Sequence, residues 1–183
     1  MSIDMHGPGL WYVTRATGLV SLLLLTASVL LGLLTAGRFA SGRWPRFLTQ
    51  GLHRNISLLV LVFLAMHIGS TVLDTYVSIS LTAVFVPFAS SYKTVWLSLG
   101  AVALDLLLAL IVTSLLRDRL GYRAWRRLHW LAYACWPVAV AHGLGTGTDR
   151  NATWVFALTM ACAVAVLAVT TWRLVAAARL EVQ

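Results

Sequence analysis

Five long apolar segments dominate this chain of 183 residues. Each approaches or exceeds the roughly 20 residues that an α-helix needs to cross the hydrocarbon core of a bilayer. A segment in lipid must satisfy its backbone polar groups internally, so segments of this kind cross as helices. We therefore predict an all-α fold, an integral membrane bundle that forms a single domain over residues 1–183, with helices over residues 10–36, 52–73, 93–116, 124–144 and 152–178.

The composition agrees with a multi-pass protein of a cell membrane, for which we expect a bacterial plasma membrane. Only 11% of the residues are charged, against about 25% in soluble domains. The net charge of +8 comes almost wholly from arginine, and Lys93 is the only lysine. The arginines gather at the ends of apolar segments rather than on a soluble face, so we expect contact with lipid and no nucleic-acid binding.

The distribution of the arginines predicts the topology. By the positive-inside rule, the loops that carry most of the arginine and lysine lie in the cytoplasm. Eleven cations belong to the first loop, the third loop and the C-terminal end, against three on the other side, Arg15, Lys93 and Arg150. These eleven are Arg38, Arg43, Arg46, Arg54, Arg117, Arg119, Arg123, Arg126, Arg127, Arg173 and Arg179. Five spans then place the N-terminus outside and the C-terminus in the cytoplasm.

The segment 74–92 leaves the span count open. It contains apolar and aromatic residues but is too short and too interrupted for an ordinary span. We interpret it as a flap at the outer surface of the membrane, with its aromatics at headgroup level. A lid over a site, a re-entrant segment and a plain loop all stay open, and a missed sixth span is most plausible here.

Four histidines lie inside the apolar segments, where an ionisable side chain is costly and usually marks a functional site. They form two pairs along the chain, His53 with His67 and His129 with His142. Spacings of 14 and 13 residues correspond to rises of about 21 Å and about 19.5 Å along a helix. His53 and His129 are therefore expected near the cytoplasmic face, and His67 and His142 toward the outside.

Matching depths on two helices allow each level to hold one haem between two imidazoles. Neutral imidazole is a good axial ligand, and two of them fill both axial positions, which suits electron transfer. A shared zinc or copper ion is excluded within each helix by the separation of about 20 Å. The alternative is a haem-free transporter, or an assembly or structural subunit, in which the histidines only form helix–helix contacts.

Helix rotation favours the first pair more than the second. Fourteen residues leave His53 and His67 about 40° apart on a straight helix, whereas thirteen leave His129 and His142 about 140° apart. Pro137 lies between the latter two, and proline distorts a helix by removing a hydrogen bond. We predict that this distortion turns His142 back toward the cofactor. On the first helix, Gly18, Ser21, Ser28 and Gly32 are spaced for close helix–helix approach.

The paired histidines resemble the ferric reductase-like transmembrane family, which includes NADPH oxidases, iron-chelate reductases and the haem-binding membrane partner of bacterial methionine sulfoxide reductase. The resemblance rests on "LHRNISLLVLVFLAMH" and "LHWLAYACWPVAVAH" and covers about residues 10–173. It implies two stacked b-type haems ligated by His53/His129 and His67/His142, and electrons passing outward from the cytoplasm. Many members have six spans where we count five, and several carry a flavin/NADPH domain that is missing here.

The other polar residues give further candidates. Arg15, Arg54, Arg126 and Arg127 are placed to contact haem propionates, although positive-inside topology also explains the last three. Asp105 lies in the middle of an apolar segment, where we expect it buried, either as a proton relay or as a protonated contact between helices. No glycine-rich dinucleotide fingerprint occurs, so we expect electrons from a cytoplasmic flavoprotein, a ferredoxin-like protein or a quinol, and an external acceptor that the sequence does not identify.

Overall fold

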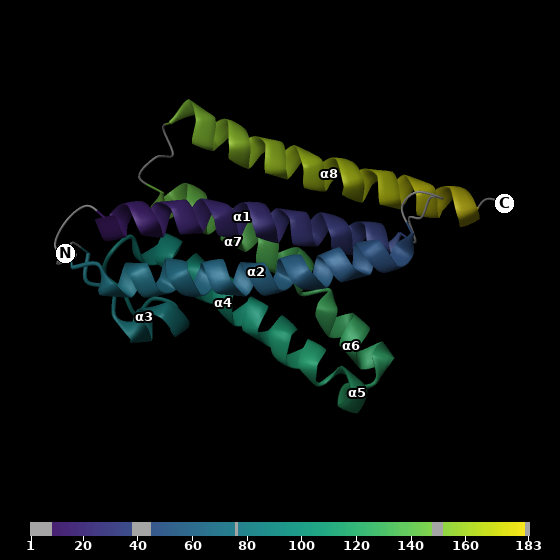
Figure 1. The fold of residues 1–183 in the computed structure, drawn as a ribbon, viewed down its shortest axis with the longest axis horizontal. Helices are drawn as coiled ribbons and strands as arrows, with labels where there is room; N and C mark the ends of the chain where they lie inside the picture. Colours follow the sequence, from purple (N-terminus) through teal and green to yellow (C-terminus); the bar gives the residue numbers. More distant parts are fainter. Residues whose placement is uncertain (1–8, 38–44, 76, 148–151, 182–183) are drawn as a thin grey trace.

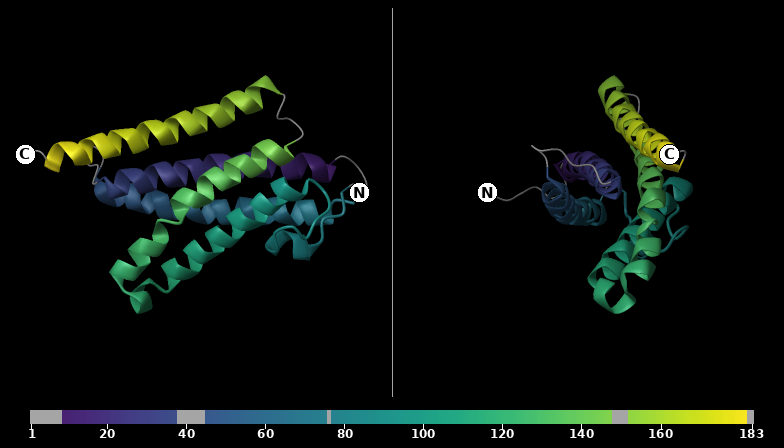
Figure 2. Two further views of the ribbon diagram at one scale, coloured as in Figure 1. Left: turned by 180° about the vertical axis from the view of Figure 1, so that it is seen from behind. Right: turned by 90° about the vertical axis from the view of Figure 1, so that its right-hand side faces the viewer.

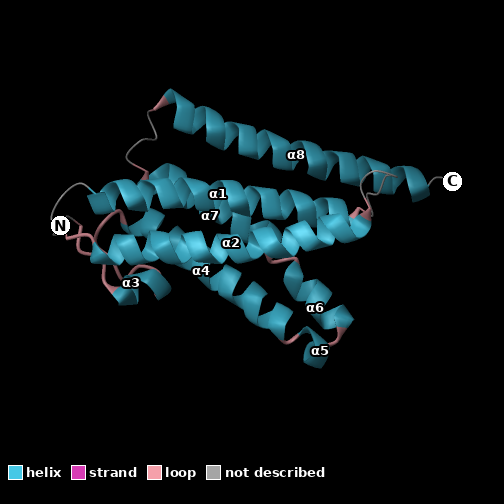
Figure 3. Ribbon diagram, viewed as in Figure 1, coloured by secondary structure: helices cyan, strands magenta, loops and turns pink. Residues whose placement is uncertain are grey.

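The computed structural model describes residues 9–37, 45–75, 77–147 and 152–181, and every regular element in these ranges is helical (Figure 3). The prediction of an all-α bundle is confirmed. Arg38, Arg43 and Arg150, which entered the topology argument, lie outside the described residues. The helices are α1 Gly9–Ala36, α2 Arg46–Leu73, α3 Leu81–Phe85, α4 Thr94–Leu115, α5 Arg117–Leu120, α6 Tyr122–His129, α7 Ala132–Thr146 and α8 Thr153–Glu181 (Figure 1).

Helices α1 and α2 form a long antiparallel pair (Figure 1). The buried face of α1 is rich in small and hydroxyl residues, among them Thr17, Ser21 and Ser28. Lipid tails are as apolar as leucine side chains, so membrane helices associate through close van der Waals packing and interhelical hydrogen bonds rather than through a hydrophobic force. Small residues let the two backbones approach, as the spacing of Gly18, Ser21, Ser28 and Gly32 suggests.

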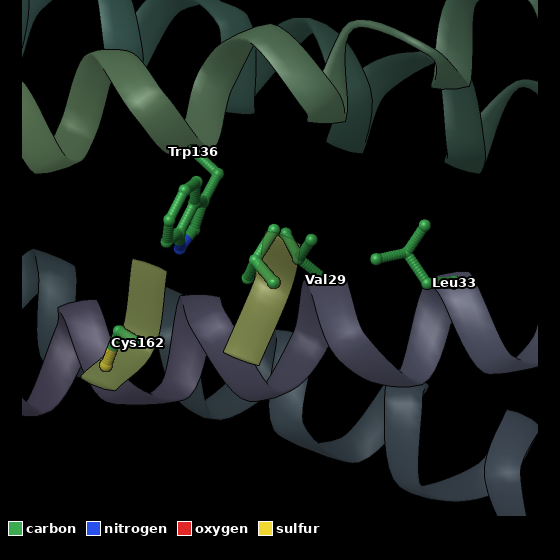
Figure 4. Packing of buried hydrophobic residues seen from close by; sticks show 5 residues of the cluster. Val29, Leu33, Trp136 and Cys162 are labelled. Carbon is green, nitrogen blue, oxygen red and sulfur yellow. The ribbon is translucent and has the colours of Figure 1, made fainter. Parts of the chain in front are cut away.

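Helices α4 and α7 form the second pair, and α6 packs against the far part of α4. Helix α8 lies along α1 on the side away from α4 (Figure 2). A buried cluster joins α1, α7 and α8 through Val29, Leu33, Trp136, Cys162 and Val166 (Figure 4). The indole Nε1 of Trp136 donates a hydrogen bond to Thr26 Oγ1 at 2.9 Å. These contacts attach the second pair to the first.

Within the described ranges, four helices are long and apolar enough to cross a membrane, namely α1, α2, α4 and α8 over residues 153–176. Helix α7 has 15 residues, fewer than the roughly 20 that a bilayer core requires. Together with α6 it returns the chain from the end of α4 to the start of α8. Helices α1 and α8 lead to termini at opposite ends of the long axis (Figure 1). The count of five spans and the orientation in the membrane stay predictions.

The helix predicted over residues 124–144 is divided in two, which corrects the sequence analysis. Around Trp130 and Leu131 the backbone N–H groups bond three residues back, to Arg127 and Leu128, instead of four. This tighter winding separates α6 from α7. Pro137, at which we expected the distortion, lies inside α7 instead. The change of direction therefore follows His129 immediately.

Residues 77–93, between α2 and α4, cover one end of the bundle. Ser80 caps the short helix α3 by accepting a hydrogen bond from Ala83 N–H, and α3 packs against the start of α4. The Phe88 N–H donates to Ser98 Oγ at 2.7 Å.

The N-terminal end of α2 differs from the prediction. Helix α2 begins at Arg46, six residues before the predicted Leu52. The first turns of α2 therefore extend the basic end of the molecule.

Candidate functional site: two histidine pairs

The four histidines meet in two pairs between α2 and the α6–α7 segment. The ring centroids of His53 and His129 are 6.3 Å apart with an interplanar angle of 78°. Those of His67 and His142 are 6.5 Å apart at 83°. All four side chains are half-buried. The pairs join residues at matching depths, as their positions in the sequence suggest.

Helix α1 holds both histidines of α2 in the same way. The Nδ1 of His67 lies 2.8 Å from the carbonyl oxygen of Thr14, and that of His53 lies 2.9 Å from the carbonyl oxygen of Ser28. The two acceptors are 14 residues apart, as are the two histidines. An antiparallel pair of straight helices thus repeats one contact at two depths.

Hydroxyl groups reinforce each of these contacts. Thr14 Oγ1 donates to Ser70 Oγ at 2.8 Å, and Ser70 Oγ donates to the His67 carbonyl at 3.1 Å. At the other level Ser28 Oγ lies 2.8 Å from Ser57 Oγ, and Ser57 Oγ donates to the carbonyl of His53 at 2.7 Å. Each acceptor residue is therefore tied to the turn of α2 that carries its histidine.

A glycine faces each of these imidazoles. Gly18 follows Thr14 by one turn, and a β-carbon built on it would lie 3.0 Å from Cε1 of His67. Gly32 follows Ser28 by one turn, and its β-carbon would lie 3.5 Å from Cε1 of His53. The residue one turn after a helical carbonyl normally shields that carbonyl with its side chain. Glycine leaves the carbonyl open to a ring from the neighbouring helix.

Helix α4 repeats this arrangement once, for His142. The Nδ1 of His142 lies 2.8 Å from the carbonyl oxygen of Trp96. Gly100 follows Trp96 by one turn, and a β-carbon there would lie 2.5 Å from Cε1 of His142. We call this combination of a carbonyl acceptor with a glycine four residues later a glycine cradle. His53, His67 and His142 each rest in one.

The cradles decide which ring nitrogen is free. A carbonyl oxygen only accepts, so Nδ1 must carry the hydrogen in these three histidines. The Nε2 atom then has a lone pair for a metal. Metal-ligating histidines usually donate their other N–H in this way, which fixes the tautomer and raises the basicity of the ligand.

The separation within each pair fits one metal between two imidazoles. With metal–nitrogen bonds of about 2 Å, two such rings on opposite sides of one ion have centroids about 6 Å apart. Within the described ranges, no group of three or more His, Cys, Asp or Glu residues is arranged to hold an ion. Two protein ligands suffice only when another group fills the remaining positions, as a porphyrin does.

A cavity of about 330 Å³ adjoins the His67/His142 pair. This volume lies within the 300–1,000 Å³ typical of small-molecule and cofactor sites. Both cradle glycines of this level, Gly18 and Gly100, line it. Val77, Ile79 and Ala83 from the segment 74–92 line it as well, so these residues lie at the level of His67 and His142.

The arginine candidates divide between the two levels. Arg15 lines the cavity with His67 and His142, and its guanidinium lies 3.9 Å from the ring centroid of Trp11. Arg54 is exposed on α2. Arg126 and Arg127 are exposed on α6 and border a shallow pocket with Tyr122, Arg123 and Trp130. Among the four candidates, Arg15 alone borders the cavity that a histidine pair also lines.

Asp105 corrects a further expectation. It lies in the middle of α4, but its side chain is exposed on the surface of the bundle. The neighbouring Ala103 and Leu104 occupy the buried face instead. The expectation that Asp105 is buried is therefore wrong, and a role in proton transfer stays a prediction.

Several residues that build the site were missed by the sequence analysis. Backbone acceptors such as Thr14 and Trp96 leave no side-chain signature, because any residue supplies a carbonyl. Trp125, whose ring stacks on His129 at 4.9 Å between centroids, lies four residues before that histidine, and this spacing could have pointed to it. The spacing of Gly18 and Gly32 predicts close helix packing, but it does not reveal that they face His67 and His53.

The geometry defines a helical membrane protein in which two pairs of histidines face one another. Residues 17–140 match the profile of the family described as "Ferric reductase like transmembrane component". The match covers more than half of the chain and includes both histidines of α2 and His129, so the chain belongs to this family. No curated protein and no solved structure matches the chain in the corresponding comparisons. Members of the family usually bind haem, and membership indicates electron transfer across a membrane.

Proposed function

We propose that this protein carries electrons across the membrane through two b-type haems, one between His53 and His129 and one between His67 and His142. The observation that carries the proposal is the set of three glycine cradles. They leave Nε2 of His53, His67 and His142 free as ligand atoms. The distances of 6.3 and 6.5 Å within the pairs support the same assignment.

The residues of the chain prepare and separate the two levels. A haem held at each level would supply a one-electron carrier. The carbonyls of Ser28, Thr14 and Trp96 orient the rings and would strengthen them as donors to iron. His53 and His67 are separated by 14 residues, which is about 21 Å along α2. Two haems held at these levels would lie toward opposite ends of the bundle.

Contacts to haem propionates fall to the arginines near each level. Arg15 would serve the outer haem, because it borders the same cavity as His67 and His142. Arg54, Arg126 and Arg127 would serve the inner haem, since they flank His53 and His129 in sequence. Arginine matches the planar, bidentate geometry of a carboxylate.

Electron transfer through the bilayer is the direct test. The haem-loaded protein would be placed in lipid vesicles that contain ferricyanide, and membrane-impermeant dithionite would be added outside. We expect reduction of the trapped ferricyanide in vesicles with the protein and none in vesicles with the His67→Ala/His142→Ala variant. Equal rates in both preparations would contradict the proposal.

The electron donor is expected to dock at the basic end of the molecule. Arg117, Arg119 and Arg123 lie on the α5–α6 segment with one acid, Asp118, among them. A field of one sign steers partners of the opposite charge and makes association depend on salt. An acidic flavoprotein or ferredoxin-like protein fits this surface, and a ferric chelate, oxygen or a partner reductase would accept electrons at the other end.

A membrane quinol is the rival donor, and salt separates the two. Haem reduction by a protein donor is expected to slow as ionic strength rises and to slow further when Arg117, Arg119 and Arg123 are changed to Gln. Reduction by quinol should respond to neither change. Rapid reduction by quinol alone, with no effect of salt or of the three substitutions on any protein donor, would eliminate docking at this surface.

A further inference from the structure

His129 differs from the other three histidines because its Nδ1 has no acceptor. This atom is buried, and no hydrogen-bond partner for it exists within the described part of the chain. The other three Nδ1 atoms lie 2.8–2.9 Å from a carbonyl oxygen. One of the four ligands proposed above is thus held by another means.

The packing of α7 on α4 explains the missing cradle. His142 contacts the carbonyl of Trp96, and Cys135 Sγ lies 3.4 Å from the carbonyl of Ala103, so both follow one antiparallel register. Continued beyond Cys135, the same register would put His129 opposite the carbonyl of Ala109. The position one turn later, where the other cradles have glycine, is Thr113.

The side chain of Thr113 engages that carbonyl. Its Oγ1 donates to the carbonyl of Ala109 at 2.7 Å, so the acceptor is already occupied. Gly100 stands at the matching position for His142, whereas Thr113 carries a branched side chain. The winding change at Trp130 and Leu131 further moves His129 from the axis of α7 onto that of α6. A fourth cradle is therefore absent for identifiable reasons.

An aromatic stack supports His129 in its place. The rings of Trp125 and His129 are 4.9 Å apart at 29°. The indole Nε1 of Trp125 donates to Ser114 Oγ on α4 at 3.3 Å, which ties the stack to the neighbouring helix. On Trp125 itself lies the guanidinium of Arg117, 4.8 Å from the ring centroid. The stack fixes the plane of the imidazole without engaging Nδ1.

We propose that Trp125 is the positioning residue of His129 and that the bond between His129 and iron is the one that added ligands displace. The inference rests on the function proposed above. A ligand histidine without its N–H acceptor is less basic and less fixed in orientation, and loss of such a partner typically weakens metal binding by about 10- to 100-fold. Small ligands of ferrous iron, such as carbon monoxide, should therefore enter at the inner haem and not at the outer haem.

The test compares four purified, haem-loaded proteins by haem content and by the spectrum of the reduced protein under carbon monoxide. In the native protein we expect carbon monoxide to shift at most one of two haems. Trp125→Ala should raise the affinity of this haem for carbon monoxide about tenfold, or release the haem. Trp125→Phe keeps a stacking ring but loses the hydrogen bond to Ser114, so it should shift carbon monoxide binding in the same direction by a smaller factor. Trp154→Ala is the control, since Trp154 on α8 is 60% exposed and lines neither the cavity at His67 and His142 nor the pocket at Arg126 and Arg127.

Ser114→Ala keeps the indole and removes its hydrogen bond, so it guards against a folding defect in Trp125→Ala. It should shift carbon monoxide binding in the same direction by a smaller factor. If the native protein holds two haems and neither Trp125→Ala nor Ser114→Ala changes haem content or carbon monoxide binding, the positioning role is refuted while the haem assignment survives. If the folded native protein takes up no haem, the proposed function fails and this inference fails with it.

Discussion

The two halves of the bundle hold the Nδ1 atoms of their histidines differently. In the α1–α2 half, one helix supplies carbonyl acceptors at both levels, from Thr14 and Ser28. In the half formed by α4, α6 and α7, the acceptor at one level is Trp96 and the other level has none. The contact between a carbonyl and an imidazole therefore occurs twice in the first half and once in the second.

The spacing of the ligands accounts for this difference. Four helical turns contain about 14.4 residues in total, close to the spacing of 14 between His53 and His67. Both histidines of α2 therefore meet the same face of α1 with no change in either helix. Thirteen residues fall about 140° out of phase on a straight helix. The change in winding at Trp130 and Leu131 absorbs the mismatch. Because of it, α4 faces His142 and His129 in different ways.

The largest expected effect is loss of a ligand from either half. His67→Ala or His142→Ala should remove the outer haem, and His53→Ala or His129→Ala the inner one, since an iron with one protein ligand is held weakly. Each variant is expected to retain about one haem of two by the pyridine haemochrome assay. If all four variants kept both haems, the assignment of the pairs would be wrong.

A methyl group in the tightest cradle should disturb the outer level next. In Gly100→Ala the new carbon would lie 2.5 Å from Cε1 of His142, so the imidazole must leave its carbonyl. We expect a loss of outer-haem affinity of about 10- to 100-fold. Gly143→Ala is the matched control, because nothing lies within 4 Å of a β-carbon there. Equal haem retention in the two variants would contradict the cradle.

The two cradles of α1 provide a graded comparison within one helix. Gly18→Ala would bring a carbon to 3.0 Å from Cε1 of His67, whereas Gly32→Ala would bring one to 3.5 Å from Cε1 of His53, which is ordinary contact. We expect the midpoint temperature of haem release to fall for Gly18→Ala and to stay near its native value for Gly32→Ala. The reverse order would show that something other than local space controls the two levels.

The smallest effect concerns the contact that joins the halves. Trp136→Phe removes the hydrogen bond to Thr26 Oγ1 but keeps an aromatic ring in the cluster with Val29 and Cys162. Loss of one hydrogen bond is expected to lower the free energy of unfolding by about 1 kcal/mol. The visible spectrum should not change, since Trp136 contacts neither pair. A spectral change without a loss of stability would assign Trp136 to the haem sites instead.

The sequence predicts the helices and the histidine pairs well because both depend on local pattern. Apolar length gives α1, α2, α4 and α8, and rise per residue gives the depths of the histidines. The break after His129 was misplaced at Pro137, since a proline is visible in a sequence and a change of winding elsewhere is not. The exposure of Asp105 depends on how α4 is rotated against its neighbours, which apolar composition on all sides does not reveal. The glycine cradles could not be predicted from the sequence, because backbone carbonyls and helix register carry no residue signature.

The central claim is that the two histidine pairs are prepared haem ligands, and the visible spectrum of the purified protein tests it most directly. We predict a reduced spectrum with the Soret and α bands of b-type haem and a haemochrome stoichiometry of two haems per chain. A folded protein that remains colourless when supplied with haem would contradict the claim. The histidines would then be polar contacts between helices of a haem-free membrane protein.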